Sequence, residues 1–285
     1  MAELMQIRQR IGAIETIKKI THAMRLISMS NHTRLKAQEP TLSSYTKRLT
    51  NLFHRTRLQA PQWYSSFLQP TSSPEGTKLI ILIGSDKGLC GNFNTTLFYF
   101  FDEYLSTSNQ VNTIYIAVGK KAIDYLEQKK KIFPFLVFKQ FTANTFLSIA
   151  HAIMDHIMLK SLPYQSVTIF SNVLKTFFLQ KPEKTILIPF ESIDETREEQ
   201  HSIIPDFYWE QNPQEVIDYL ARQIITGTLE YLLFQSLIAE QASRFISMDS
   251  STRNADRLLD HTKQLYNKLR QATITKELAE LTGSF

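Results

Sequence analysis

The chain has 285 residues, of which 43% are hydrophobic and 21% charged, and this composition excludes an intrinsically disordered protein. No apolar run reaches the roughly 18 residues that a membrane-spanning helix needs. The single cysteine, Cys90, excludes an internal disulfide and fits a reducing compartment. The net charge is +5, and residues 1–60 hold 11 Lys and Arg against 3 Asp and Glu. This basic segment should attract an anionic partner, such as nucleic acid, lipid or an acidic protein surface.

The first 60 residues predict a long helix with an apolar face. No Gly or Pro occurs between Ala13 and Glu39, and apolar side chains recur at steps of three or four residues, which is the spacing of one helix face. The steps of three are too frequent for a strict heptad, so we expect any supercoil to be irregular there. This apolar face consists of Ile7, Ile11, Ile14, Ile17, Ile20, Met24 and Ile27.

Proline marks the end of this N-terminal segment. Pro40 should end or kink the helix, because its ring removes a backbone hydrogen bond. A helical pattern resumes from Leu42 to Leu58. Residues 61–76 hold prolines separated by serines, and this composition predicts a linker. We therefore assign residues 1–60 to an N-terminal coiled-coil helix and the following residues to a linker that ends at residue 76.

Residues 77–208 alternate between apolar, β-branched runs and helical patterns. This alternation predicts a partly parallel sheet with helices packed on it, which is a Rossmann-like α/β domain. Beyond its last helix we expect a hairpin in which a Lys-Pro-Glu-Lys turn joins Phe177–Gln180 to Thr185–Phe190. The other expected strands are Lys78–Ile83, Thr113–Val118 and Ser166–Phe170, and the expected helices are Asn94–Leu105, Lys120–Lys130 and Asn144–Leu159.

Residues 209–285 predict a second very long helix. Pro213 suits its first turn and Asn212 is a plausible N-cap, while only Gly227 interrupts the pattern before Gly283 closes it. At roughly 1.5 Å per residue, this helix would be about 100 Å long. A chain that leaves on one long helix and returns on another can pair its ends. The predicted fold class is therefore α/β, with a long antiparallel coiled coil of the N- and C-terminal helices and a Rossmann-like middle domain.

The sequence contains no recognisable catalytic or metal-binding motif. GSDKGLCGN follows a predicted strand and precedes a helix, which is where phosphate-binding turns occur. Its glycines, Gly84, Gly88 and Gly91, have the wrong spacing for a dinucleotide fingerprint, so a tight turn is the simpler interpretation. The histidines are scattered and form no HExxH pattern. We expect no catalytic residue, no metal site and no cofactor.

Segments at three separated places, the two ends and the middle of the chain, resemble the γ subunit of F-type ATP synthases, the central rotor stalk. IRQRI at residues 7–11 and KKITHAMRL at residues 18–26 match an IxxxI element followed by K-I-T-x-A-M. SDKGLCGNFN at residues 85–94 looks like the family's S-D-R-G-L-C-G-G-L-N. ASRFISM at residues 242–248 and YNKLRQATITKEL at residues 266–278 resemble its C-terminal helix. The order and spacing of these segments agree with the family over essentially the whole chain.

The resemblance implies a mechanical function. The coiled coil would stand inside a ring of three α and three β subunits, and the middle domain would form a foot against the ε subunit and the membrane c ring. Ion flow, usually of protons, would turn this central stalk and drive ATP synthesis, and hydrolysis would run the cycle backwards. The chain would be a non-catalytic subunit, peripheral on the cytoplasmic side of the bacterial inner membrane.

The resemblance also implies site residues. Arg270 and Gln271 would engage a catch loop of a β subunit. Met24 and Arg25 match the helix segment that would face the C-terminal helix and the lower β-subunit surface. Thr273 and Met24 could instead only pack the coiled coil. Gly88 and Gly91 would form a structural turn of the foot domain. The partner-binding residues would thus be Met24, Arg25, Arg270, Gln271, Thr273 and Glu277.

The sequence departs from the family pattern in several places, among them Gly283-Ser-Phe285, and these departures leave open a specialised paralogue whose ring or ion differs from the standard one. ISMSNH at residues 27–32 replaces an Ala- and Lys-rich stretch, and Gly91-Asn92 replaces a glycine pair. These changes suggest a divergent bacterial-type protein. A nucleic-acid-binding coiled-coil protein remains the alternative from another class, because residues 1–60 are basic. A nucleotide-binding enzyme built on the middle domain is the third interpretation.

Overall fold

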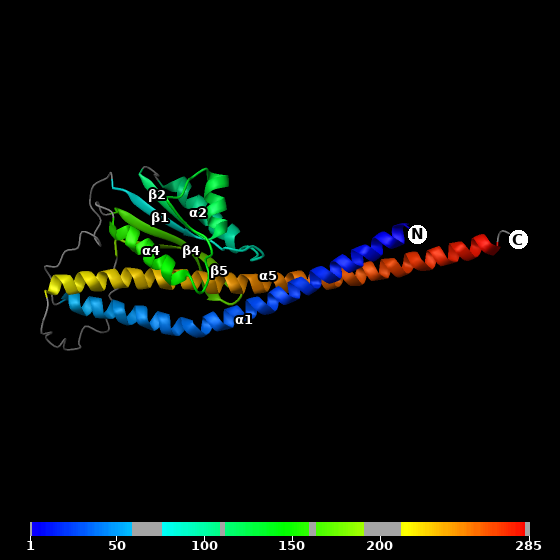
Figure 1. Ribbon diagram of the computed structural model, residues 1–285, viewed down its shortest axis with the longest axis horizontal. Helices are drawn as coiled ribbons and strands as arrows, with labels where there is room; N and C mark the ends of the chain where they lie inside the picture. The colour runs from blue at the N-terminus through cyan, green and yellow to red at the C-terminus, as the bar shows by residue number, and fades with distance from the viewer. Residues whose placement is uncertain (1, 59–75, 109–111, 160–163, 191–211, 283–285) are drawn as a thin grey trace.

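The computed structural model shows a long two-helix shaft with an α/β domain beside one half of it (Figure 1). Both chain termini lie towards the tip of the shaft, away from this domain (Figure 1). The structure describes residues 2–58, 76–108, 112–159, 164–190 and 212–282. The predicted linker, apart from its last residue, and the last residues of the expected middle domain lie outside these ranges.

The shaft consists of α1, Ala2–Leu58, and α5, Pro213–Thr282. The segment between them folds into strands and shorter helices that alternate along the chain. In chain order these are β1 Lys78–Ile83, α2 Phe93–Thr107, β2 Thr113–Val118, α3 Lys120–Asp124, the π-helix η1 Tyr125–Lys130, β3 Leu136–Phe138, α4 Phe146–Leu159, β4 Ser166–Thr176 and β5 Leu179–Ile188.

The five strands form one sheet in the order β3-β2-β1-β4-β5. The first four strands are parallel, and β5 is antiparallel to β4. The parallel part has the strand order of doubly wound α/β folds, in which the order reverses between β1 and its neighbour β4. The Rossmann-like middle domain and its pairing with two long helices are therefore confirmed.

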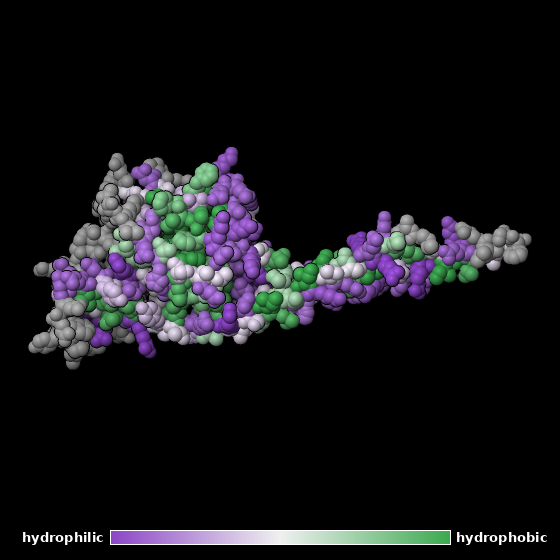
Figure 2. All heavy atoms as spheres, in the orientation of Figure 1, coloured by the Kyte–Doolittle hydropathy of each residue, from purple (hydrophilic) through white to green (hydrophobic). Residues whose placement is uncertain are grey.

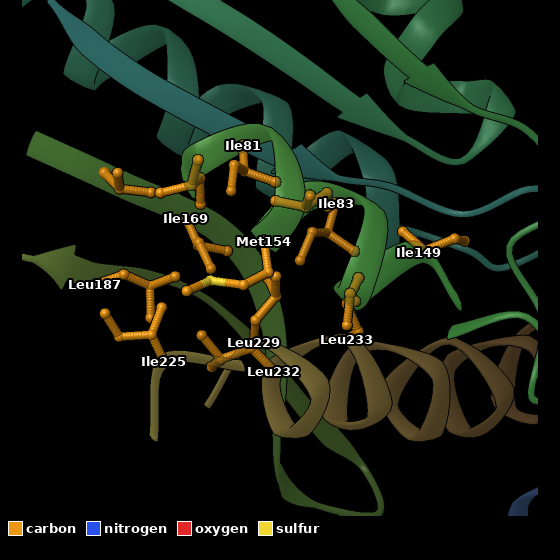
Figure 3. Packing of buried hydrophobic residues seen from close by; sticks show 14 of the residues in the cluster. Ile81, Ile83, Ile149, Met154, Ile169, Leu187, Ile225, Leu229, Leu232 and Leu233 are labelled. Atoms are coloured by element: carbon orange, nitrogen blue, oxygen red, sulfur yellow. The ribbon is translucent and has the colours of Figure 1, made fainter. Parts of the chain in front are cut away.

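Both faces of the sheet are buried, which explains the uninterrupted apolar run of β1. Ile81 and Ile83 point to the face covered by α4 and α5, where they join a core with Met154 and Leu229 (Figure 3). Ile80 and Leu82 point to the opposite face, under α2, α3 and η1. Because α5 supplies part of the first core, the long helix is built into the domain and does not merely touch it.

The two shaft helices are antiparallel, and their seam differs from the predicted isoleucine face. Ile17, Ile20 and Ile27 are 53%, 55% and 55% exposed. The side chains that turn inward follow alternating steps of four and three, a strict heptad that replaces the expected irregular pattern. On α1 this seam runs through Ile7, Ile11, Ile14, Lys18, Thr21, Arg25, Ser28, His32 and Leu35, and on α5 through Met248, Thr252, Ala255, Leu259, Thr262, Tyr266, Leu269 and Thr273.

We expected Pro40 either to end the first helix or to kink it, and it does not end the helix. α1 continues through Pro40 to Leu58, and its ribbon bends along the way (Figure 1). Buried side chains anchor the helix on both sides of the proline, Leu35 before it and Phe53 after it, and both belong to the main core. This packing offsets the roughly 3 kcal/mol that an interior proline costs a helix.

The predicted hairpin was placed wrongly, and one strand was missed. β5 runs straight through the Lys-Pro-Glu-Lys sequence, and the true turn lies at Phe177 and Phe178, between β4 and β5. Pro182 is tolerated because β5 is an edge strand of the sheet. The short strand β3 gave no clear signal, because its alternation extends over few residues and Pro134 precedes it.

The start of α5 follows its sequence signals. The side-chain oxygen Oδ1 of Asn212 accepts a hydrogen bond from the backbone N–H of Gln214 at 3.1 Å, which confirms the predicted N-cap. The helix passes through Gly227 without a break. An added Cβ there would lie 3.7 Å from the Tyr45 ring of α1, which is an ordinary contact distance, so the packing of the two helices does not require glycine at this position. The predicted closing residue, Gly283, lies outside the described residues.

Candidate functional site

The shaft seam is held by polar and charged pairs as well as by apolar contacts. Lys18 pairs with Asp256, and Thr252 Oγ1 donates a hydrogen bond to Thr21 Oγ1 at 3.0 Å. Further along, Gln235 Nε2 donates to Glu39 Oε1 at 2.6 Å. Glu39 lies 21 residues beyond Lys18, and Gln235 lies 21 residues before Asp256. The two helices therefore keep one antiparallel register over this length.

Arg25 takes part in this seam, and Met24 borders it. The Arg25 Nη1 atom donates to Asp249 Oδ1 at 2.8 Å, and the same carboxylate also binds Arg253 at 2.8 Å. Both Arg25 and Asp249 are half-buried, and so is Met24 beside them. Arg25 thus faces α5, which is one of the two surfaces that the resemblance implied for this segment.

The other predicted partner-binding residues lie near the tip of α5. Arg270, Gln271 and Glu277 are exposed, and Thr273 is half-buried at the end of the heptad seam. The Thr273 hydroxyl donates to the Leu269 carbonyl at 2.9 Å, within its own helix. Arg270 lies 21 residues from Asp249, or about 30 Å along the helix. The structure therefore separates the predicted residues into two regions and does not bring them together in one site.

The loop that contains Gly88 and Gly91 is fastened to the middle of α5. Arg244 donates to the backbone carbonyls of Gly88 and Lys87, each at 3.3 Å, and Ser243 Oγ donates to the Cys90 carbonyl at 2.7 Å. Gly91 has a φ of +54°, and an added Cβ would lie 3.5 Å from Ser247. Side chains of α5 thus bind the carbonyl groups along this loop.

A buried ion pair supports this attachment. Arg244 also binds Glu240, one helical turn away, and the two side chains are only 5% and 6% exposed. Burial raises the pKa of the Glu240 carboxyl, and the neighbouring Arg244 guanidinium opposes this shift. A buried charge pair of this kind needs further hydrogen bonds to offset desolvation, and here the loop carbonyls supply them.

Further hydrogen bonds, within the loop and from β4, hold this loop in shape in addition to its contacts with α5. The Asn94 side chain accepts from the Ser85 backbone N–H at 3.0 Å and donates to Ser85 Oγ at 2.7 Å. Asn172 of β4 donates to the Phe93 carbonyl at 2.9 Å. Burial raises the pKa of the nearby Cys90 thiol, so this thiol stays protonated. No sequence pattern indicated that the loop binds another part of the same chain.

This loop occupies the position where open α/β sheets usually bind their ligands. That position is the carboxyl end of the strands where the strand order reverses, here between β1 and β4. The side chains of Ser243 and Arg244 bind the loop from α5. The spacing of the glycines in GSDKGLCGN is thus explained by a turn that is shaped to pack against a helix.

Sequence reasoning missed Glu240, Ser243, Asp249 and Asn172 as functional candidates. Ser243 and Arg244 lie in the C-terminal segment that resembled a known family, but nothing there showed what they bind. Among the described residues, no helix is long and apolar enough to cross a membrane, and no three His, Cys, Asp or Glu side chains are grouped to hold a metal ion.

Comparisons with known proteins agree with this architecture. The family model described as ATP synthase matches residues 3–285. The ATP synthase gamma chain of Clostridium perfringens is 30% identical over 286 residues, which cover 99% of this chain and 97% of that protein. The gamma chain of Rickettsia typhi is 28% identical over 292 residues, which cover 99% and 98% of the two chains.

The fold is also similar to that of solved structures. A chain in the Euglena gracilis mitochondrial ATP synthase structure, described as OSCP, F1 and c-ring, has a TM-score of 0.69 at 15% identity, covering 99% of this chain and 93% of that one. A second structure of the Euglena enzyme, described as its rotor, gives a TM-score of 0.64 at 16% identity. With the full-length family match, these findings show that the chain belongs to the ATP synthase gamma chain family, the central stalk of F-type ATP synthases.

Proposed function

We propose that this chain is the rotor shaft that couples ion flow through a membrane c ring to ATP synthesis and hydrolysis. The supporting observation is that α5 is one helix of 70 residues that belongs to both parts of the molecule. It contributes to the core of the sheet domain at one end and forms the exposed tip at the other. A continuous helix paired with a second one can transmit a twist between the two ends.

The tip would stand within a ring of α and β subunits, and the sheet domain would lie against an ε subunit and the c ring. The shaft surface carries hydrophobic and hydrophilic side chains side by side (Figure 2). A surface that differs around its circumference contacts the surrounding subunits differently at each angle. Differential contact of this kind is what shifts a partner between conformations.

Within this function, the exposed Arg270 and Gln271 would engage a β-subunit catch loop, with Glu277 one to two turns further on. Met24 would contact the lower β-subunit surface. The roles of Arg25 and Thr273 would be mainly within the shaft, because their polar groups already have partners there. Gly88 and Gly91 would serve the attachment of the sheet domain.

The chain would act without a catalytic residue, cofactor or metal of its own, and it would be held on the cytoplasmic side of a bacterial inner membrane through its complex. We also propose the division into residues 1–60, 61–76, 77–208 and 209–285. Truncation before Ala272 should then weaken torque or assembly and leave the sheet domain folded. Loss of all structure on truncation would argue against this division.

An Arg270→Ala substitution tests the proposed function. Coupled ATP hydrolysis by the assembled complex should fall several-fold, while nucleotide affinity of isolated β subunits stays the same. Lys268→Ala is the matched control, because Lys268 is also exposed and lies two residues away. Equal activity of the wild type and the Arg270 variant in the assembled complex would remove Arg270 from the contact region.

The nucleic-acid alternative loses part of its support in the structure. Lys18, Arg25 and Lys36 of the basic segment are paired with Asp256, Asp249 and Glu39. These pairs reduce the positive charge available to phosphates. Binding of DNA or RNA that weakens steeply with salt would revive this alternative.

A further inference from the structure

Asp86 ties together the turns that follow three neighbouring strands. Its Oδ1 atom accepts a hydrogen bond from the Gln140 backbone N–H at 3.2 Å and a longer one from the Lys120 backbone N–H at 3.4 Å. Asp86 lies in the loop after β1, whereas Lys120 begins α3 just after β2, and Gln140 lies just beyond β3. Because the carboxyl ends of parallel strands meet at one edge of the sheet, a single carboxylate reaches all three turns.

Gln140 has a strained backbone that this contact helps to hold. Its φ is +61°, in the left-handed region that residues other than glycine rarely adopt. Such a conformation persists where the surroundings keep it in place. The hydrogen bond from the Gln140 N–H to Asp86 is a contact of this kind, and the charge of the carboxylate strengthens it. The turn after β3 is thus fixed to the loop after β1.

The loop that contains Asp86 is held to α5 from its other side. Arg244 donates to two of its backbone carbonyls, each at 3.3 Å, and Ser243 donates to a third at 2.7 Å. α5 packs against α4 and β4, while β2 and β3 lie on the far side of β1 from β4. Residues 85–91, named the strap, therefore connect the turns of the outer strands β2 and β3 to the shaft helix.

Both ends of the strap rely on a charged side chain. A loop that only filled the space between the sheet and α5 would need neither the Asp86 carboxylate nor the Arg244 guanidinium, and charge-assisted hydrogen bonds are roughly twice as strong as neutral ones. Without the strap, a force on β2 or β3 would reach α5 through packed side chains, which permit small sliding motions between elements. Hydrogen bonds at both ends of the strap oppose such sliding.

We propose that the strap transmits load between the outer strands of the sheet domain and the shaft, with Asp86 and Arg244 as the positioning residues at its two ends. This inference rests on the proposed rotor function, in which torque passes between the sheet domain and the tip. The strap keeps β2 and β3 from lagging behind α5 when the shaft turns against a load. The link itself is present in the isolated chain, where it is tested without partners.

Hydrogen exchange in the full chain tests the link. Ser243→Ala combined with Arg244→Lys removes hydrogen bonds between α5 and the strap, while a positive charge stays beside Glu240. Exchange at the Gln140 amide should become at least tenfold faster in this double variant, because a strap released from α5 holds Asp86 less firmly. An unchanged exchange rate at Gln140 would overturn the proposal.

Two single variants complete this test. Ser243→Ala alone should accelerate exchange at Gln140 in the same direction and by less, so the result does not depend on the folding of the double variant. Thr226→Ala is the matched control, because this buried α5 hydroxyl donates to the Arg222 carbonyl of its own helix at 2.9 Å. Equal acceleration in Thr226→Ala and Ser243→Ala would show a general loosening of α5 and would contradict a link through the strap.

Ion pumping by the assembled complex tests the mechanical role. In closed vesicles, Asp86→Ala should lower the ion gradient that ATP hydrolysis sustains at least twofold, because the gradient is the load on the shaft. Hydrolysis without a gradient should stay at the wild-type rate. Asp86→Asn should behave as the wild type, because its amide oxygen accepts the same two hydrogen bonds. A gradient that is unchanged by Asp86→Ala, or lowered equally by Asp86→Asn, would overturn the proposal.

Failure of the proposed rotor function gives a different result. A wild-type assembly whose ATP hydrolysis moves no ions would contradict the rotor function, and the mechanical role of the strap with it. A wild type that pumps normally, together with an Asp86→Ala variant that sustains the same gradient, would contradict the strap alone.

Discussion

Arg25 of α1 and Asp249 of α5 are 224 residues apart in the sequence, and their side chains meet at 2.8 Å across the shaft. Both groups are half-buried, and Asp249 also binds Arg253. The pair lies in a heptad seam that holds Lys18, Thr21 and Ser28 where a coiled coil usually holds apolar residues. Polar pairs at such positions fix one register, because shifting the helices would leave each of them unpaired.

The Arg25–Asp249 pair should contribute modestly to stability and more clearly to register. In a double-mutant cycle with Arg25→Ala and Asp249→Ala, we expect a coupling energy of about 1 kcal/mol at low salt, because both groups remain partly exposed. The coupling should weaken in 1 M salt as the charges are screened. Chemical denaturation of the full chain measures it. A coupling energy of zero at low salt would contradict the finding.

Ile14 and Ile17 should respond very differently to the same substitution. Ile14 is 5% exposed and packs against Ala255 and Leu259, whereas Ile17 points outward. Ile14→Ala should lower the free energy of unfolding by about 2 kcal/mol, and Ile17→Ala should change it by less than about 0.5 kcal/mol. Denaturation of the isolated full chain tests this pair. Equal effects would show that the heptad seam is not the one described.

Three glycines of the sheet domain should form a graded series. Gly119 has a φ of +86°, and an added Cβ would lie 2.4 Å from the Gly84 carbonyl oxygen, so Gly119→Ala should cost about 3 kcal/mol. Gly91→Ala keeps a positive φ without a clash and should cost about 1 kcal/mol. Gly88→Ala should be nearly neutral, because nothing lies within 4 Å of its added Cβ. Urea midpoints of the three variants should follow this order.

Removing only one charge of the buried Glu240–Arg244 pair should lower the free energy of unfolding more than expected from the effect of removing both charges together. Glu240→Ala leaves the guanidinium of Arg244 buried without its partner, and we expect a loss of about 3 kcal/mol. The double variant Glu240→Ala, Arg244→Met should be more stable, by more than about 1 kcal/mol, than the summed losses of Glu240→Ala and of Arg244→Met alone would give. Denaturation curves measure all three. Simple additivity would mean that the two side chains do not interact.

Stability should fall as the pH drops below about 6.5, partly because of His32. Burial lowers the pKa of His32, which packs against the Phe177 ring at 4.9 Å and whose Nε2 has no hydrogen-bond partner among the described residues. The unfolded chain, with a His pKa of about 6.5, then binds a proton before the folded chain does. The stability contribution is therefore complete above about pH 6.5 and is lost as the pH falls through the lower folded pKa.

A His32→Leu substitution should flatten this slope by at most about 1.4 kcal/mol per pH unit, the limit for one proton. Part of the pH dependence of stability should remain in this variant because of His54, whose pKa is also lowered by burial. His261→Gln serves as the control, since His261 is exposed. Free energies of unfolding between pH 5 and pH 8 measure the slope. An identical slope in wild type and His32→Leu would exclude His32 as a contributor.

The sequence by itself determined the family and most of the elements, although not the hairpin turn or β3. The apolar run Lys78–Ile83 reads as a buried strand, and long stretches without proline or glycine read as helices, because these signals depend on nearby residues. The C-terminal YNKLRQATITKEL segment pointed to the gamma chain family without a structure. Asn212 was recognised as an N-cap for the same reason, since its hydrogen bond reaches only two residues along the chain.

Only the tertiary structure decided which side chains meet. The spacing of isoleucines suggested a face through Ile17 and Ile20, but α5 packs on the face through Lys18, Thr21 and Arg25, where it supplies acidic and hydroxyl partners. Pro40 stays inside a helix because Leu35 and Phe53 are buried on either side of it. Such outcomes depend on the sum of contacts with residues some 200 positions away, and no local pattern contains that sum.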